Sequence, residues 1–205
     1  MLNIYLTRHG QDEDNKIGVL NGHRDTALTE LGLDQARQLA IQIKESGLIF
    51  DTIYSSPLSR TYKTAKIIAE KLGLNDPILD DNLIERNFGD MTGHKISEAL
   101  EVYADNLLRT KTIPYVISFR GGEDFPELIE RAKTLLAEIN EKHQDGNILL
   151  VTHGDFGKMI YAAYYDLDWK EVLSLFHFGN SDLVLLAPGT KAAETHIFKN
   201  KQFNL

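Results

Sequence analysis

Three short apolar stretches that resemble buried strands constrain this chain's fold most. They cover residues 2–7, 52–55 and 147–152, and each ends in a cluster of polar side chains. Segments in which apolar residues recur at helical spacing separate them. Strands that alternate with helices are typical of a parallel sheet covered by helices on both faces. The sequence therefore predicts an α/β fold, three-layer α/β/α with a mostly parallel central sheet.

Capping residues mark the ends of the predicted helices. Thr29 suits an N-cap, and Gly47 suits the end of the helix that follows it. Ser56 and Pro57 suit the N-cap and first residue of the next helix. By spacing, the helices are expected at 29–46, 56–73, Ile96–Leu108, Phe125–Lys142 and Gly154–Tyr165.

The last part of the chain predicts a hairpin of two strands. Asp182–Ala187 and Ala193–Phe198 are the expected strands, with Pro188-Gly189 at the turn. Neither a low-complexity tract nor a linker divides the sequence, so residues 1–205 are expected to form one domain. Within it, residues 94–122 are the expected insertion, acting as a lid.

Composition and charge exclude several classes of protein. The net charge is −8, and the 22 Lys and Arg residues are dispersed among 30 acids, which argues against a nucleic-acid partner. The sequence has no cysteine, so it holds neither a disulfide nor a thiolate nucleophile. No apolar run approaches the ~20 residues of a membrane helix. Met1 leads directly into a strand without a signal-peptide pattern, so a cytoplasmic protein without a membrane partner is expected.

Two arginines and two histidines follow the predicted strands closely. Arg8 and His9 come after the first, Arg60 after the second, and His153 after the third. The carboxyl ends of parallel strands share one sheet edge, where α/β proteins bind ligands. Arginine forks match phosphate, and a neutral imidazole is nucleophilic near pH 7. A phosphate site is therefore expected, in which the second ring nitrogen of His9 bonds a backbone carbonyl.

A leaving alkoxide also needs a proton, and a carboxylic acid can supply it. Glu85 lies in a turn-rich segment that can fold over the sheet edge. From spacing alone, however, Glu98 and Glu123 are equal candidates for this general acid.

Five blocks of sequence carry a family resemblance. In chain order they are Leu6–Asn15, Asn21–Thr29 with Gly32 and Gln35-Ala36, Ser55–Thr61, Glu85–Gly93, and Val151–Gly154. Together they resemble the histidine phosphatase superfamily, which has a phosphoglycerate mutase-like fold, and in particular its phosphatase branch.

This resemblance implies a role for each candidate residue. His9 would be the nucleophile that is phosphorylated. Arg8, Arg60 and His153 would form the phosphate pocket. Glu85 would act as general acid and then as the base for water.

The resemblance also implies the substrate contacts and the kind of enzyme. Asn15 would contact the phosphate, and Asn21 and Gly22 would line the substrate's approach. The implied enzyme is a phosphoric monoester hydrolase of the histidine acid phosphatase type, acting on a small phosphorylated metabolite. It would need neither a metal nor another cofactor.

Two other functions stay open. A phosphoglycerate mutase would share the first half-reaction and return the phosphoryl group to the product. The second is a catalytically silent protein that binds a phosphorylated ligand.

The chain departs from the family pattern at two places. Asp12 stands where the family usually has Ser or Thr, and Glu13 and Asp14 extend the acidic run. Negative charge at this place weakens the binding of multiply anionic substrates unless the side chains face solvent. Met91 replaces a frequently aromatic residue, which is expected to alter the wall near the leaving group.

Overall fold

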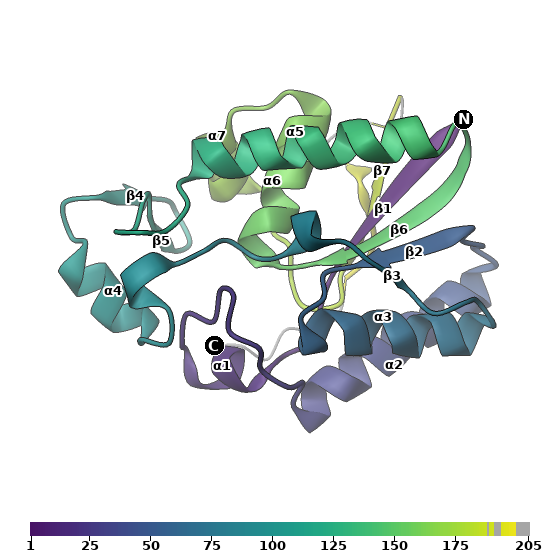
Figure 1. Ribbon diagram of the computed structural model, residues 1–205, viewed down its shortest axis with the longest axis horizontal. Helices are drawn as coiled ribbons and strands as arrows, with labels where there is room; N and C mark the ends of the chain where they lie inside the picture. The colour runs from purple at the N-terminus through teal and green to yellow at the C-terminus, as the bar shows by residue number, and fades with distance from the viewer. Residues whose placement is uncertain (188, 191–193, 200–205) are drawn as a thin grey trace.

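The protein is built on one six-stranded sheet, shown in Figure 1. The computed structural model describes residues 1–187, 189–190 and 194–199. In spatial order the strands are β3 (Ile78–Leu79), β2 (Thr52–Ser55), β6 (Gly146–Thr152), β1 (Leu2–Arg8), β7 (Leu183–Leu186) and β8 (His196–Phe198). The first four strands run parallel to one another. Strand β7 is antiparallel to β1, and β8 is antiparallel to β7. The predicted, mostly parallel α/β fold is therefore confirmed.

The register of the central strands brings the three polar clusters to one edge. Arg8, the last residue of β1, pairs with Thr152, the last residue of β6. Ser55, the last residue of β2, pairs with Val151. The residues that follow β1, β2 and β6 consequently lie side by side, although His9 and His153 are 144 positions apart in the chain.

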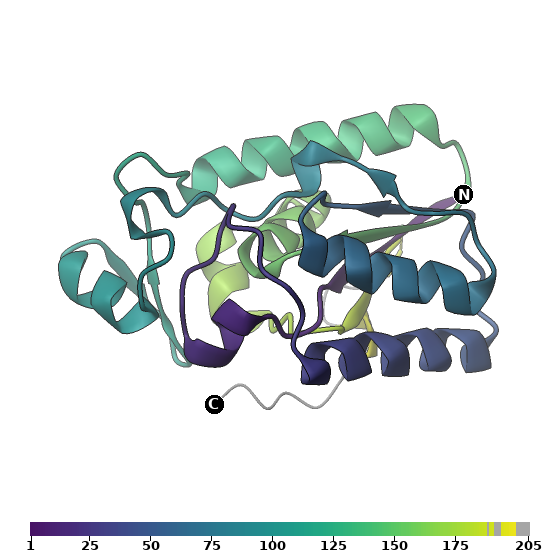
Figure 2. The same cartoon turned by 60° about the horizontal axis from the view of Figure 1, so that its bottom comes forward.

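Helices cover both faces of the sheet. Figures 1 and 2 show α2 (Glu30–Ser46) and α3 (Ser59–Leu72) on one face. On the other face lie α5 (Phe125–Lys142), α6 (Gly154–Tyr165) and α7 (Trp169–Leu175). Side chains of adjacent strand residues enter opposite cores, because they alternate across a strand. Ile148 packs against α5 and α6, and Leu149 packs against α2 and α3.

The start of α3 differs from the prediction. The helix begins at Ser59 and its N-cap is Leu58, so assigning Ser56 and Pro57 to the cap was wrong. The cause is a distant side chain: the carboxylate of Asp25 accepts the Ser59 N–H at 2.7 Å and satisfies the helix end. The hydroxyl oxygen of Ser56 instead lies 3.0 Å from Nε2 of His153.

The helix predicted over Ile96–Leu108 is also shorter than expected. Helix α4 ends at Val102, and Leu107–Arg109 forms strand β4, which pairs antiparallel with β5 (Pro114–Val116). In so short a segment the apolar residues fit both the helical period and the strand period, so pairing with β5 decides its structure.

Several short elements were not predicted. Besides β3 to β5 and α7, they are α1 (Glu13–Ile17) and the 3₁₀ helices η1 (Asp81–Leu83) and η2 (Gly89–Met91). Of the predicted hairpin, both strands are present in shorter form, and Gly189 has a φ of 82°. Pro188 and Ala193 lie outside the described residues.

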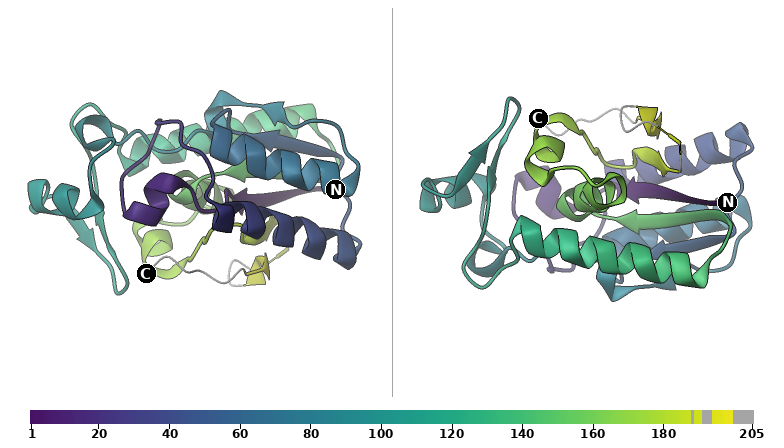
Figure 3. Two further views of the ribbon diagram at one scale, coloured as in Figure 1. Left: turned by 90° about the horizontal axis from the view of Figure 1, so that it is seen from below. Right: turned by 90° about the horizontal axis from the view of Figure 1, so that it is seen from above.

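The 94–122 segment stands apart from the layers, at the end of the sheet where β1 finishes (Figure 3). Together with the residues just before it, this segment forms a separate small apolar core, in which Phe88 and Met91 pack with Phe119. That residues 1–205 form a single domain, with 94–122 as its lid, stays a prediction. Within the described residues, no helix is long and apolar enough to cross a membrane.

Candidate active site

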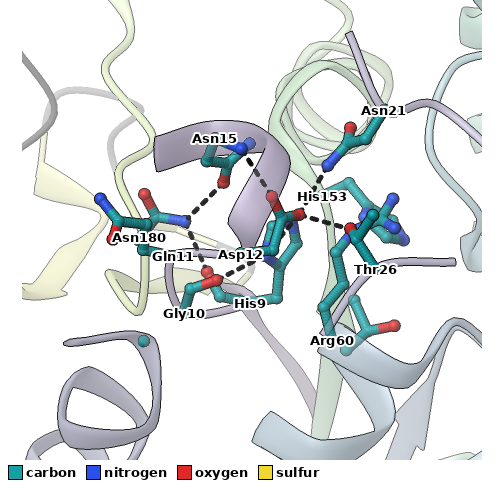
Figure 4. A network of polar contacts seen from close by, with 12 residues as sticks. His9, Gly10, Gln11, Asp12, Asn15, Asn21, Thr26, Arg60, His153 and Asn180 are labelled. Atoms are coloured by element: carbon teal, nitrogen blue, oxygen red, sulfur yellow. Dashed lines mark hydrogen bonds and ion pairs between the residues drawn. The ribbon is translucent and has the colours of Figure 1, made fainter. Parts of the chain in front are cut away.

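Four of the predicted site residues lie at the carboxyl edge of the sheet, and Figure 4 shows three of them, His9, Arg60 and His153. His9 follows β1, and His153 is the N-cap of α6. Their rings meet edge to face, with centroids 5.1 Å apart. Arg60 projects from the first turn of α3 and is completely buried, while Arg8 ends β1. Sheet register and helix starts, rather than proximity in sequence, create this cluster.

The ring of His9 is fixed through its Nδ1 atom. Nδ1 lies 2.6 Å from the carbonyl oxygen of Gly10. A carbonyl only accepts hydrogen bonds, so this contact places the proton on Nδ1 and leaves Nε2 with a free lone pair. Burial, together with the charges of Arg60 and Arg8, holds the pKa of His9 well below its usual value. His9 is therefore a neutral, oriented imidazole at neutral pH.

The pKa of His153 is lowered in the same way. Burial is the main cause, followed by the charge of Arg60 and the neighbouring ring of His9. His153 is therefore neutral at neutral pH. Its Nε2 contacts the Ser56 hydroxyl at 3.0 Å.

Three buried nitrogen atoms at this point lack hydrogen-bond partners among the described residues. They are Nε of Arg8, Nδ1 of His153, and Nε of Arg60, which faces the carboxylate of Asp12 at 3.3 Å without a hydrogen bond. The two terminal nitrogens of Arg60 are already used, because they donate to the carbonyls of Arg24 and Gly22 at 2.7 and 2.8 Å. Buried polar nitrogens without hydrogen bonds are unfavourable, so this arrangement can accommodate an anion that accepts hydrogen bonds from them.

Glu85 is held at the start of α6. Its Oε2 accepts the N–H groups of Gly154 and Asp155, at 2.9 and 3.2 Å. Its Oε1 accepts those of Arg86 and Phe156, at 2.9 and 3.0 Å. The N–H groups of the first turn of α6, directly after His153, thus fix the carboxylate of Glu85.

The two other glutamates considered from the sequence lie elsewhere. Glu98 is half-exposed and contacts His94 at 3.0 Å. Glu123 forms an ion pair with Arg131 at 3.0 Å. Of the three, Glu85 alone lines the cavity beside Arg8. Geometry therefore makes the choice that spacing left open.

The predicted substrate-binding residues also reach the cluster. Oδ1 of Asn15 accepts a long hydrogen bond from Arg8, at 3.4 Å. Asn15 and Asn21 both line the cavity. Gly22 contributes through its carbonyl, which holds Arg60, and its φ of 48° suits glycine.

A cavity of about 230 Å³ opens beside Arg8 and Glu85. Its polar end includes Asp155 and Lys158, which the sequence did not single out. Residues of the 94–122 segment supply an apolar wall next to Phe88. They are Ile96, Leu100, Ile113, Tyr115 and Phe119. Met91 packs in the separate apolar core with Phe88 and Phe119 and does not line the cavity, so it does not form the wall directly.

Sequence reasoning missed the position of Asp12 and the part played by Asn180. Asp12 does not face solvent: it is fully buried, and only Glu13 of the acidic run is exposed. Asn180 donates to the backbone carbonyl of His9 at 2.8 Å. No local signal identifies Asn180, because its place depends on β7 pairing next to β1.

The described residues contain no group of three or more His, Asp or Glu side chains placed to hold a metal ion. What the site offers instead is an oriented imidazole, two guanidinium groups and a fixed carboxylate. Such a set can bind a phosphoryl group and stabilise the charge of its transfer.

Comparison with known proteins agrees with this chemistry. A family model described as the histidine phosphatase superfamily (branch 1) matches residues 4–200. Phosphoserine phosphatase 1 of Hydrogenobacter thermophilus is 34% identical over 85% of this chain and 81% of its own. A 2,3-bisphosphoglycerate-dependent phosphoglycerate mutase of Parvibaculum lavamentivorans is 33% identical over 84% of each.

Solved structures show the same fold. A phosphoserine phosphatase mutant from Entamoeba histolytica, in complex with phosphoserine, has a TM-score of 0.75 and 28% identity over 90% of both chains. A mycobacterial glucosyl-3-phosphoglycerate phosphatase, in complex with VO3, has a TM-score of 0.78 and 27% identity over 90% of this chain and 92% of its own. The chain thus belongs to the histidine phosphatase superfamily, branch 1.

Proposed function

We propose that this protein is a metal-independent phosphomonoesterase that works through a phosphohistidine on His9. The observation that carries this proposal is the contact between Nδ1 of His9 and the Gly10 carbonyl, beside three buried nitrogen atoms that lack hydrogen bonds. This contact leaves Nε2 of His9 as a nucleophilic nitrogen beside nitrogen atoms that can bind an anion. No thiol or hydroxyl nucleophile is required.

In the first step, Nε2 of His9 attacks phosphorus and forms the N–P bond. The P–O bond to the alcohol breaks, and its electron pair leaves with the alcohol oxygen. Arg8, Arg60 and His153 donate to the phosphoryl oxygens as charge shifts toward them. Glu85 protonates the leaving oxygen; it takes up that proton with the substrate, because a phosphate monoester of pKa₂ about 6 is partly protonated at neutral pH.

In the second step, water replaces the histidine. The carboxylate of Glu85 takes a proton from water, whose oxygen bonds to phosphorus. The N–P electron pair returns to Nε2 of His9, and inorganic phosphate is released. Glu85 ends protonated and gives up this proton as the phosphate leaves, which restores the carboxylate for the next protonated substrate.

The basic residues favour hydrolysis over mutase chemistry. A bisphosphate requires cations beyond those at the first phosphate. The lid segment carries Lys95, Arg109, Lys111 and Arg120, and within the described residues none of these four side chains lines the cavity. Lys95 is used elsewhere, since it donates to a backbone carbonyl at 2.6 Å. Besides Arg8, the cations that line the cavity are Lys158 and Arg86, and the guanidinium of Arg86 already donates to three backbone carbonyls.

The substrate is a small phosphate monoester. Relatives named for phosphoserine and for glucosyl-3-phosphoglycerate support this class. The apolar wall of the cavity can contact the carbon skeleton of the alcohol, while Lys158 can pair with one further anionic group. Mutase chemistry remains the second candidate, because mutases are among the similar proteins.

Phosphate release in excess EDTA tests the proposal. We would assay an aryl phosphate, phosphoserine and 3-phosphoglycerate with wild type, His9→Ala and His143→Ala. His143 is a matched control, since it contacts Tyr54 at 2.9 Å away from the cluster. Release that persists in EDTA and in His143→Ala but is lost in His9→Ala is expected.

Other results contradict the proposal in distinct ways. Dependence on added metal, or undiminished release by His9→Ala, would exclude the phosphohistidine mechanism. Isomerisation of 3-phosphoglycerate with 2,3-bisphosphoglycerate, without release, would identify a mutase. Binding of phosphate without either reaction would identify a silent phospholigand-binding protein.

A further inference from the structure

Asp12 contacts four of the residues that surround the proposed phosphate site. Its Oδ1 accepts the Asn15 N–H at 2.7 Å and so caps α1. Its Oδ2 accepts from Nδ2 of Asn21 at 2.6 Å and lies 3.3 Å from Nε of Arg60. The same oxygen lies 4.0 Å from Nδ1 of His9. Figure 4 shows Asp12 at the centre of this network.

A buried carboxylate in a phosphate site needs a physical reason. Alone it repels the substrate, and its burial is unfavourable enough to raise the pKa of Asp12, although the Asn15 N–H and Arg60 oppose this. Two arginines and two histidines surround the anion, so Asp12 offsets part of the positive charge that would otherwise be buried without a partner. The network also holds Arg60 and Asn21 in place through one side chain.

The reaction at His9 supplies a second reason. When neutral Nε2 bonds to phosphorus, Nδ1 keeps its proton and the ring becomes a cationic phosphoimidazolium. A carboxylate oxygen 4.0 Å from Nδ1 stabilises this cation more than it stabilises the neutral ring. A serine or threonine at the same place has no charge to offer.

We propose that Asp12 is a positioning residue of this enzyme: it orients Arg60 and Asn21, and its charge stabilises the cationic ring of phosphorylated His9. The inference rests on the proposed function of His9. The inference goes beyond the proposed function because it assigns a task to Asp12, the acidic residue that stands where the family usually has Ser or Thr.

Two anions separate this role from a merely structural one. Orthovanadate bonds to a histidine nitrogen and makes the ring cationic, whereas inorganic phosphate binds without that bond. We would measure the affinity of wild type and Asp12→Asn for each anion by titration calorimetry. Asparagine keeps the shape and the helix cap but removes the charge.

For Asp12→Asn we expect vanadate affinity to fall by roughly tenfold to a hundredfold, the scale at which supporting residues act on reactive side chains. Phosphate affinity should be unchanged or higher, because a repelling charge is gone. The matched control is Asp14→Asn. Asp14 is also buried, but it pairs with Arg24 at 3.1 Å. The Asp14→Asn variant should keep the wild-type affinities for vanadate and for phosphate.

Unchanged vanadate affinity, or parallel losses for both anions, would overturn the role of Asp12. So would equal effects in Asp14→Asn, or a wild type that binds no vanadate. Asp12→Ser, which also keeps the cap, repeats the test if Asp12→Asn does not fold. If the vanadate effect appears but wild type hydrolyses no ester, the proposed function fails while the inference about Asp12 holds.

Discussion

The carboxylate of Glu85 accepts a hydrogen bond from the backbone N–H of Gly154 at 2.9 Å. These residues are 69 positions apart, and the bond joins the segment after η1 to the first turn of α6. Because Gly154 follows His153 directly, the same turn positions both the proposed acid, Glu85, and a proposed phosphate ligand, His153. A helix N-terminus favours a carboxylate through its free N–H groups and its dipole.

Changing Glu85 to glutamine tests its role through the leaving group. Glu85→Gln should lower kcat for alkyl phosphates by roughly 10²- to 10⁴-fold, because a poor leaving group needs the proton. An aryl phosphate leaves more easily, so its loss should be much smaller. Single-turnover kinetics with phosphoserine and p-nitrophenyl phosphate measure both.

Glutamine also places an NH₂ group against N–H donors of α6, so a loss of stability has to be separated from a loss of catalysis. Unfolding curves for Glu85→Gln serve as that control. If a folded variant lost the same factor on both substrates, general-acid catalysis by Glu85 would be ruled out.

Replacing Arg60 with lysine should weaken the phosphate site. The guanidinium donates to two backbone carbonyls while its Nε faces Asp12 at 3.3 Å, and an ammonium group cannot reproduce that fork. We expect kcat/KM of Arg60→Lys to fall by about 10²-fold, the typical effect of losing one charge-stabilising donor. Arg37→Lys, on the exposed surface of α2, is the control and should keep wild-type kinetics. Wild-type kcat/KM in Arg60→Lys would exclude a direct phosphate contact.

The two buried histidines should make the protein less stable in mild acid. The folded pKa values of His9 and His153 lie well below 6.5, the usual value to which they return on unfolding. Below about pH 6.5 the unfolded chain therefore binds protons that the folded protein does not. Stability is complete above that pH and is lost on acidification, by up to about 1.4 kcal/mol per pH unit for each histidine.

Urea unfolding at pH 7.0, 6.0 and 5.5 measures this loss. His177 and His196 have lowered pKa values too and act in the same direction, while the raised pKa of Asp12 acts in the opposite one. The double variant His9→Asn/His153→Asn keeps those three groups, so its difference from wild type isolates the pair. Parallel pH dependences in the two proteins would show that the histidines are not held neutral.

The parts of the fold that were predicted correctly have local causes. Helix α2 is capped by Thr29 and Gly47 as expected, because its caps and its apolar face lie within or next to its own segment. The strands β1 and β6 are apolar along their length, and their polar ends follow directly. The meeting of His9 and His153 then follows from parallel pairing.

The features that were not predicted depend on distant contacts. The start of α3 is set by Asp25, which is 34 positions from Ser59. Strand β4 exists because Leu107 pairs with Val116. The burial of Asp12 depends on Arg60 and Asn21 arriving from other elements, and an acidic run carries no local sign of that.

The glycine after His9 should be as sensitive as the histidine itself. A Cβ on Gly10 would overlap the backbone of Gly32, at the start of α2. The two backbones would have to separate, at an expected loss of about 1–3 kcal/mol in stability for Gly10→Ala. Separation also moves the Gly10 carbonyl that holds Nδ1 of His9, so kcat should fall beyond any loss of folded protein.

A second glycine provides the comparison for Gly10→Ala. Gly47 ends α2 with a φ of 75°, and a Cβ there meets no atom within 4 Å. Gly47→Ala should therefore cost about 1 kcal/mol from backbone strain alone and leave kcat unchanged. Urea unfolding and single-turnover kinetics on both variants measure the two quantities. If Gly10→Ala kept wild-type kcat in its folded fraction, the Gly10 carbonyl would not be what orients His9, and the nucleophile's geometry would need another cause.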